Sequence, residues 1–287
     1  MKHGLRVIVF IVICLVGAGG AVADDGIIRM GDRQEVTFST MVADLAGADA
    51  IFVGEVHNDP VHHRLQLAVM RALYERKAKL AIGLEMFQPE SQQFLDDWVA
   101  GKMKEEDFQA VYSKNWTFAW SLYRDIFVFA RDNKIPMIAL NIPKQIASKV
   151  ARQGFASLTD DEKKALPAGI TCELKSAYTD LLKVAFGQVY KQLIKQGSFN
   201  NFCESQTLRN RAMAMNIARY RTEHPDRKVV AIAGIWHAVK GGAPANLLDV
   251  GKGSIRVVIP EIPELGPQNA TRQETDYLVR RQDKTEQ

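Results

Sequence analysis

Short apolar runs alternate with helix-like segments along this chain of 287 residues. Four of the runs are rich in β-branched residues, are long enough for one strand, and end on a cluster of polar side chains: 51–59, 80–88, 135–143 and 229–238. Strand-length runs followed by helical segments are typical of a parallel sheet. A fifth strand is expected at 255–259. The pattern therefore predicts an α/β fold with a mostly parallel sheet and flanking helices.

The polar residues that end these runs are expected to meet at one edge of the sheet. Right-handed crossovers place the C-terminal ends of parallel strands on the same edge, and open α/β sheets bind ligands there. The residues that this argument brings together are Glu55, His57, Glu85, Asn141 and His237. The sequence thus predicts a site built from distant parts of the chain.

The strand signal disappears between residues 146 and 224, where helical patterns are expected at about 159–166, 171–196 and 201–223. We expect this stretch to form an all-helical cap subdomain over the sheet edge, where it would shield a site from water or hold a flat ligand. The predicted division is a signal peptide at 1–23, an α/β core at 24–145 and 225–265, the helical cap at 146–224, and a C-terminal tail at 266–287.

The N-terminus has the pattern of a targeting signal. Lys2 and Arg6 precede an apolar stretch at 7–16, and the small residues around Ala23 suit a signal peptidase. The apolar stretch is too short for a comfortable membrane span. We therefore expect cleavage after Ala23 and export, to a bacterial periplasm.

Lipidation at Cys14 is the alternative to cleavage after Ala23, and the sequence disfavours it. A lipobox needs a small residue before the cysteine, whereas Ile13 stands there. The net charge of +4 falls to +2 once Lys2 and Arg6 are removed with the leader. That charge is too small, and too little interleaved with aromatic residues, to favour nucleic-acid binding.

Two cysteines remain in the exported chain, Cys172 and Cys203. An even pair in an oxidising compartment favours a disulfide. Two buried thiols in a helical region are the alternative. Their separation, without a further Cys or His nearby, is a poor zinc signature.

The segment that contains Glu55 and His57 can support metal binding or acid–base chemistry, because alternate residues of an extended chain share a side. In the alternative interpretation Glu55 caps the next helix and the loop satisfies His57. His62 or His63 can reach the same edge from the first helical turn; the four-residue spacing places His62 on the face of Gln66.

The polar residues after the other apolar runs also have both a functional and a structural explanation. Glu85 needs a partner because an unpaired buried carboxylate is costly, and His57 or His237 are expected to provide it; otherwise Glu85 caps a helix. Trp236, beside His237, can stack on a planar ligand. The glycine pair at 241–242 offers backbone N–H groups to an anion. A role as a turn residue explains Asn141 nearly as well.

Several familiar catalytic motifs are absent from the sequence. His62 and His63 do not form the HExxH motif of zinc proteases, and the chain has no GxSxG, no Walker A motif and no GxGxxG that opens a helix. Esterase, P-loop and dinucleotide-binding functions therefore lose their main support.

A set of motifs in a fixed order resembles the ChaN-like family of haem-binding, iron-regulated proteins. The matching segments are GEVHNDPVHHRLQ at 54–66, GLEMF at 83–87, the segment ending in Tyr123, ALNIP at 139–143, QTLRNRAMAMNI at 206–217, AGIWHAVKGGAP at 233–244 and TDYLV at 275–279. They span most of the exported chain. Trp236 departs from the pattern, because a glycine is more usual beside the histidine.

The resemblance implies an α/β core with a helical subdomain and a haem site at a homodimer interface, with tyrosine as the axial ligand. An anionic phenolate suits ferric haem. The motifs do not place that ligand, and the candidates are Tyr123, Tyr178, Tyr190 and Tyr277, with Trp236 as a further haem contact. An outer-membrane haem-uptake protein is a candidate partner.

The family belongs to a wider superfamily with TIKI/TraB proteins and erythromycin esterases. That resemblance implies catalytic roles for Glu55, His57, Glu85 and His237, with His57, His237 and Glu85 as ligands of a divalent metal in the alternative. The leading hypothesis is an exported haem-binding protein that serves haem or iron acquisition or storage. A Glu/His- or metal-dependent hydrolase is the second, and a passive envelope protein with an unused site is the third.

Overall fold

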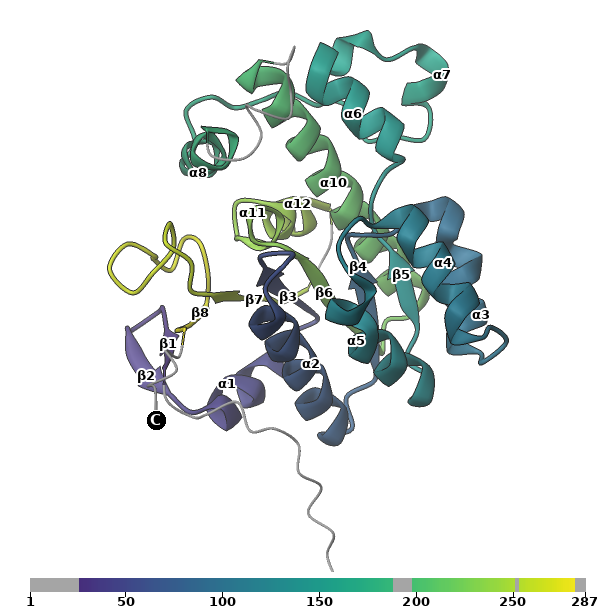
Figure 1. Ribbon diagram of the computed structural model, residues 1–287. Coiled ribbons are helices and arrows are strands. Elements are labelled where there is room, and N and C mark those ends of the chain that lie inside the picture. Colours follow the sequence, from purple (N-terminus) through teal and green to yellow (C-terminus); the bar gives the residue numbers. More distant parts are fainter. Residues whose placement is uncertain (1–25, 188–197, 251–252, 282–287) are drawn as a thin grey trace, which may run out of the picture.

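The structure is a computed structural model that describes residues 26–187, 198–250 and 253–281. A single sheet lies at its centre, with helices on both faces (Figure 1). The predicted signal peptide and Tyr190 lie outside the described residues. The strands are β1 (Ile27–Arg29), β2 (Gln34–Val36), β3 (Ala50–Glu55), β4 (Leu80–Leu84), β5 (Met137–Ala139), β6 (Lys228–Gly234), β7 (Ile255–Pro260) and β8 (Tyr277–Val279).

The strand order in the sheet is β2-β1-β8-β7-β3-β6-β4-β5. Strands β8, β7, β3, β6, β4 and β5 pair in parallel, and within the described residues antiparallel pairing is confined to β1 with β2 and β8. The α/β prediction is therefore confirmed. The connection from β3 to β4 passes β6, and the connection from β6 to β7 passes β3, so the chain leaves these two neighbouring strands in opposite directions along the sheet. Ligands of open α/β sheets bind at such a point.

Both faces of the central strands are buried, which explains why the runs are continuously apolar. In β3, Ile51 and Val53 contribute to one core and Ala50 and Phe52 to the other. The first core is completed by helices before and after β4: α1 (Phe38–Leu45), α2 (Pro60–Glu75), α3 (Gln92–Val99), α4 (Glu105–Asn115) and α5 (Trp120–Asp132). No helix within the described ranges combines the length and the apolar character needed to cross a bilayer.

The helix starts follow the capping residues in the sequence. The Thr37 side chain accepts from the backbone N–H of Thr40 at the start of α1. Asp59 does the same for Val61 at the start of α2, with Pro60 in the first turn. An Asx cap followed by Pro is a well-known start signal. The cap fixes the direction in which α2 leaves the sheet edge.

In its described part, the segment between β5 and β6 contains helices and irregular stretches but no strand. It contains α6 (Lys144–Gln153), α7 (Asp160–Lys163), α8 (Ala177–Ala185) and α10 (Phe199–Glu223). In Figure 1, α6, α7, α8 and the start of α10 lie beyond the ends of the strands. The second half of α10 packs on the sheet through Met213 and Ile217. The separate cap subdomain therefore remains a prediction.

The helix expected at 171–196 begins later, at Ala177, and residues 188–197 lie outside the described residues. Residues 171–175 are not helical, because Ser176 caps α8 by accepting from the N–H of Thr179. The Cys172–Cys203 disulfide is present, with the Cα atoms 5.5 Å apart. It ties the irregular segment before α8 to α10 and confirms the predicted pairing over the buried-thiol alternative.

Candidate functional site

The C-terminal ends of β3, β4 and β6 bring four predicted residues together. Glu55 ends β3 opposite Gly234 of β6 in the parallel register. Glu85 follows β4, and one of its carboxylate oxygens accepts from the Gly234 N–H at 2.6 Å. His237 follows β6 in the short helix α11 (Ile235–Ala238). We refer to Glu55, His57, Glu85, His237 and their hydrogen-bond partners as the strand-end site.

Glu55 is a buried carboxylate whose two oxygens are fully used. His57 Nδ1 lies 2.8 Å from Oε1, and the Tyr123 phenol donates to the same oxygen. Gln66 Nε2 donates to Oε2 at 2.8 Å, and His63 Nδ1 lies 3.2 Å from it. Burial alone would raise the pKa of Glu55, but the bonds from His57 and His63 outweigh it and lower that pKa. Glu55 is therefore an ionised group that orients its neighbours.

His63 is the histidine of α2 that reaches this carboxylate. Its Nε2 lies 3.1 Å from the His57 carbonyl oxygen, which can only accept, so Nε2 carries a proton. Burial lowers the pKa of His63, but the bond to Glu55 overcomes this and raises it. His63 Nδ1 also lies 3.3 Å from Gln66 Oε1, so His63 is the histidine of this helical turn that contacts Gln66. His62 instead accepts from the Val56 N–H at 2.9 Å, and burial lowers its pKa.

His57 is more exposed than Glu55, Glu85 and His237, with a side chain 23% exposed. Its ring packs against Trp116 and Phe118 at 4.9 and 5.0 Å between centroids. A Cβ on Gly234 would lie 2.7 Å from His57 Cε1, so this ring requires glycine there. Burial lowers the pKa of His57, but the Glu55 bond overcomes it and the pKa is raised. The pair is therefore an oriented acid–base group.

The partner of Glu85 is Arg209 on α10, which corrects the expectation of His57 or His237. Arg209 Nη2 donates to Glu85 Oε1 at 2.5 Å, and its Nε donates to Asn141 Oδ1 at 3.2 Å. Asn141 in turn donates to the Glu85 carbonyl oxygen. Burial alone would raise the pKa of Glu85, but the nearby cationic groups lower it. A guanidinium is a better partner here than an imidazole because it is always charged.

His237 is buried and neutral. Its Nδ1 lies 2.6 Å from Asn210 Oδ1, which accepts, so Nδ1 carries the proton. Burial and then the charge of Arg209 lower the pKa of His237 to about 3. Its Nε2 lies 3.6 Å from Glu85, but we do not treat this as an ion pair, because Arg209 is closer and already neutralises that carboxylate.

The metal alternative gains no support from this arrangement. Among the residues that the structure describes, no three His, Cys, Asp or Glu side chains are placed to hold a metal ion. Glu85, one of the three ligands in that alternative, is already held by Arg209. The anion site expected at the glycine pair is also wrong for Gly242, because its N–H donates to the Val239 carbonyl at 2.7 Å.

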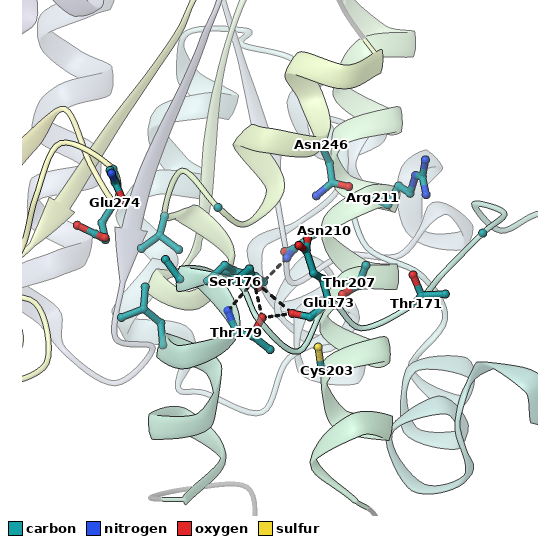
Figure 2. A pocket seen from close by; sticks show the side chains of 17 residues that line it. Thr171, Glu173, Ser176, Thr179, Cys203, Thr207, Asn210, Arg211, Asn246 and Glu274 are labelled. Carbon is teal, nitrogen blue, oxygen red and sulfur yellow. Dashed lines mark hydrogen bonds between the residues drawn. The ribbon is translucent and has the colours of Figure 1, made fainter.

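A cavity of about 480 Å³ adjoins the strand-end site and is shown in Figure 2. The irregular segment before α8, the start of α8, α10 and the loop after α11 form its walls. We call it the Tyr178 cavity, and the lining residues used below are Glu173, Tyr178, Thr207, Asn210, Arg211 and Glu274. Asn210 is buried and links the cavity to His237, since its Nδ2 donates to the Tyr178 hydroxyl at 2.7 Å.

The structure separates the candidate tyrosines. Tyr123 is buried under Glu55, and Tyr277 is buried and donates to Asp44 Oδ2 of α1 at 2.8 Å. Burial raises the pKa of both phenols, which opposes formation of a phenolate. Tyr178 is half-buried, lines the cavity and donates to the Trp236 carbonyl. The Trp236 ring packs beside the disulfide on the cluster around Leu182 and Phe202.

Gln66, Arg209 and Asn210 were not expected in the site. Their position in the sequence was the available signal for a role in the site. Gln66 lies three residues after His63. Arg209 and Asn210 lie on a long helix whose apolar pattern is broken by buried polar residues. Such residues need partners inside the protein. The sequence does not say which partners, because α10 and the strand ends are far apart in the chain.

Two solved structures are similar to this chain, to different degrees. The chain is similar in structure to a solved structure described as cofacial haem binding to ChaN of Campylobacter jejuni, with a TM-score of 0.69, 19% identity, and coverage of 88% of this chain and 95% of that one. A structure of the erythromycin esterase EreC in its open conformation gives a TM-score of 0.49 at 14% identity, covering 82% of this chain and 76% of that one. This second likeness is too low to carry an argument.

A curated relative, the chloroplastic protein RETICULATA-RELATED 5 of Arabidopsis thaliana, is 27% identical over 134 residues, which is 44% of this chain. The chain spans only 18% of that protein's length. A family model described as haem-binding uptake, Tiki superfamily, ChaN matches residues 41–247, which include every element of the strand-end site. The chain therefore belongs to the ChaN family of haem-binding uptake proteins in the Tiki superfamily.

Proposed function

We propose that this protein binds haem, with the macrocycle in the Tyr178 cavity. The observation that carries the proposal is the family match over residues 41–247. The similar structure, ChaN of Campylobacter jejuni, is described as binding haem, and its fold matches most of this chain. A cavity of about 480 Å³ is within the usual size of small-molecule sites.

The residues of the cavity suit a ferric porphyrin. Among the candidate tyrosines that the structure describes, Tyr178 is the one that lines this cavity, and tyrosine is an established haem ligand. The Asn210 amide donates to the Tyr178 oxygen and would stabilise a phenolate there. Bound haem would supply the iron chemistry, Tyr178 would hold the iron, and Asn210 would fix the Tyr178 oxygen.

We also propose that the protein is exported to the periplasm and acts in haem or iron acquisition or storage, as a homodimer, with an outer-membrane haem-uptake protein as a partner. The leader-like pattern at 1–23 supports export, and a disulfide suits an oxidising compartment. Cell fractionation tests the location, and light scattering of the haem-loaded protein tests the dimer.

A hydrolase that uses the strand-end site is the second candidate, and the exposed edge of His57 favours it. Glu55 cannot serve as the base, because its oxygens already accept from four side chains. It orients His57, which becomes the acid–base group. Turnover of an ester substrate that is lost in His57→Gln but not in Tyr178→Phe would support this function.

A haemin titration of residues 24–287, followed by absorbance, tests the leading proposal. We expect saturable binding with the spectrum of ferric haem bound through tyrosinate. Tyr74→Phe is a matched control, because Tyr74 is exposed on α2 and away from the cavity. Absence of saturable binding by the wild-type protein would refute haem binding.

A further inference from the structure

Arg211 is a cationic side chain that lines the Tyr178 cavity. One of its terminal nitrogens donates to the Ala168 carbonyl oxygen at 3.2 Å, which anchors the guanidinium on the irregular segment before α8. Arg211 has no ion pair with any residue in the described ranges. The remaining N–H groups of its planar fork are therefore free to bind a carboxylate in two-point fashion.

Thr207 lies one helical turn before Arg211 and lines the same cavity. Residues four apart on a helix share a face. The Thr207 hydroxyl has no hydrogen-bond partner among the residues that the structure describes. A guanidinium and a hydroxyl on one helix face can together bind both oxygens of a carboxylate.

Two carboxylates also line the cavity and determine where an acid group can lie. Glu274 is on the opposite side of the view from Arg211 in Figure 2, and it accepts from the Thr271 backbone and side chain at 2.7 Å. Glu173 lies on the segment before α8 and forms no ion pair with Arg211. An acid group of a ligand is therefore expected at Arg211 and away from Glu274, and the negative charge of Glu173, which lines the same cavity, opposes its binding.

We infer that Arg211 and Thr207 form a carboxylate-binding subsite of the Tyr178 cavity, which selects planar ligands that carry an acid group. The inference rests on the proposed haem function and states which part of the ligand α10 holds: a propionate of the macrocycle. The negative charge of Glu173 lowers the affinity of this subsite for a carboxylate.

The test compares haemin with haemin dimethyl ester, which has the same ring and iron but no free carboxylate. We expect Arg211→Gln to weaken haemin binding about tenfold, the effect of losing one charge-assisted contact. The haemin affinity of Arg211→Lys should lie between those of the wild-type protein and Arg211→Gln, because lysine keeps the positive charge and lacks the planar guanidinium. Glu173→Gln should bind haemin about twofold to threefold more tightly, because a like charge is removed. None of these changes should alter affinity for the diester.

Arg219→Gln is the matched control, since Arg219 is exposed on the same helix and contacts Asn216. Circular dichroism must show that each variant is folded. If wild-type protein binds haemin but Arg211→Gln binds it equally well, the subsite is wrong and haem binding stands. If Arg211→Gln weakens haemin and diester alike, Arg211 shapes the cavity and does not bind a carboxylate. If the wild-type protein binds neither compound, both proposals fail.

Discussion

The strand-end site and the Tyr178 cavity lie side by side but satisfy their polar groups in opposite ways. At the strand ends Glu55 accepts four contacts, and Glu85 is held by Arg209 and a backbone N–H. In the cavity Arg211 lacks a counter-ion and Thr207 lacks a partner among the described residues. A network that satisfies itself stabilises the fold, whereas unpaired groups beside open space are available to a ligand. Asn210 contacts both regions and couples them.

The largest expected effect comes from Glu55→Gln in the strand-end site. The change leaves His63, His57 and the Tyr123 phenol around a neutral amide, and loss of one partner in a buried ion pair costs about 3–5 kcal/mol. Urea unfolding measures this free energy. Thr207→Val in the cavity wall is the contrasting variant and should cost under about 1 kcal/mol, as at most sites that lack a buried network. Equal losses would refute the distinction between the two regions.

Reduction of the Cys172–Cys203 disulfide should act mainly on the cavity. The bond closes a loop of 31 positions, and such a bond stabilises a protein by about 2–4 kcal/mol. The Cys172→Ser/Cys203→Ser double variant should also bind haemin more weakly, because the segment that carries Glu173 and Ala168 is no longer tied to α10. Unfolding and haemin titration of the same sample measure both effects. Weaker folding with unchanged haemin affinity would show that the tether does not shape the cavity.

The close packing of the strand-end site is tested by Gly234→Ala. The added Cβ would lie 2.7 Å from His57 Cε1, and overpacking of this kind typically costs about 1–3 kcal/mol. Gly31→Ala is the control, because nothing lies within 4 Å of its added Cβ. Thermal unfolding of both variants measures the difference. Two equally stable variants would mean that His57 moves freely.

The neutral state of His237 predicts a dependence of stability on pH. Its folded pKa of about 3 lies below the usual 6.5, so only the unfolded chain takes up this proton as the pH falls from 6.5 toward 3. Stability therefore falls over that range, by at most about 1.4 kcal/mol per pH unit. His57 and His63 act in the opposite sense, because their folded pKa values are raised and their contribution is lost as the pH rises.

The comparison of wild-type protein with His237→Gln isolates the His237 contribution to this pH dependence. Below pH 6.5 the stability of the variant should fall less steeply than that of the wild type. The two slopes should differ by at most about 1.4 kcal/mol per pH unit. Tyr178→Phe, in the cavity, should keep the wild-type slope. Parallel curves for wild type and His237→Gln would mean that His237 is charged in the folded protein.

The sequence predicted the sheet and the strand-end residues because both depend on local patterns. Apolar runs of strand length and the polar residues at their ends are sufficient to bring Glu55, Glu85 and His237 to one edge. The Cys172–Cys203 pairing followed from the number of cysteines and the expected compartment. The order of the strands required the structure, because β3 pairs with β6 across most of the chain.

The cavity could not be predicted in the same way. It depends on how α10 lies against the strand ends, and polar residues on a long helix do not reveal which neighbour they face. Arg209 therefore displaced the histidines expected as partners of Glu85. Four tyrosines were equivalent in the sequence, and burial separates Tyr178 from Tyr123 and Tyr277.

The most direct measurement is a haemin titration of Tyr178→Phe and His57→Gln beside the wild-type protein. We expect Tyr178→Phe to lose the tyrosinate spectrum and most of the affinity, and His57→Gln to keep both, because the proposed haem site is the Tyr178 cavity and not the strand-end site. The reverse result, with binding lost in His57→Gln and retained in Tyr178→Phe, would contradict it.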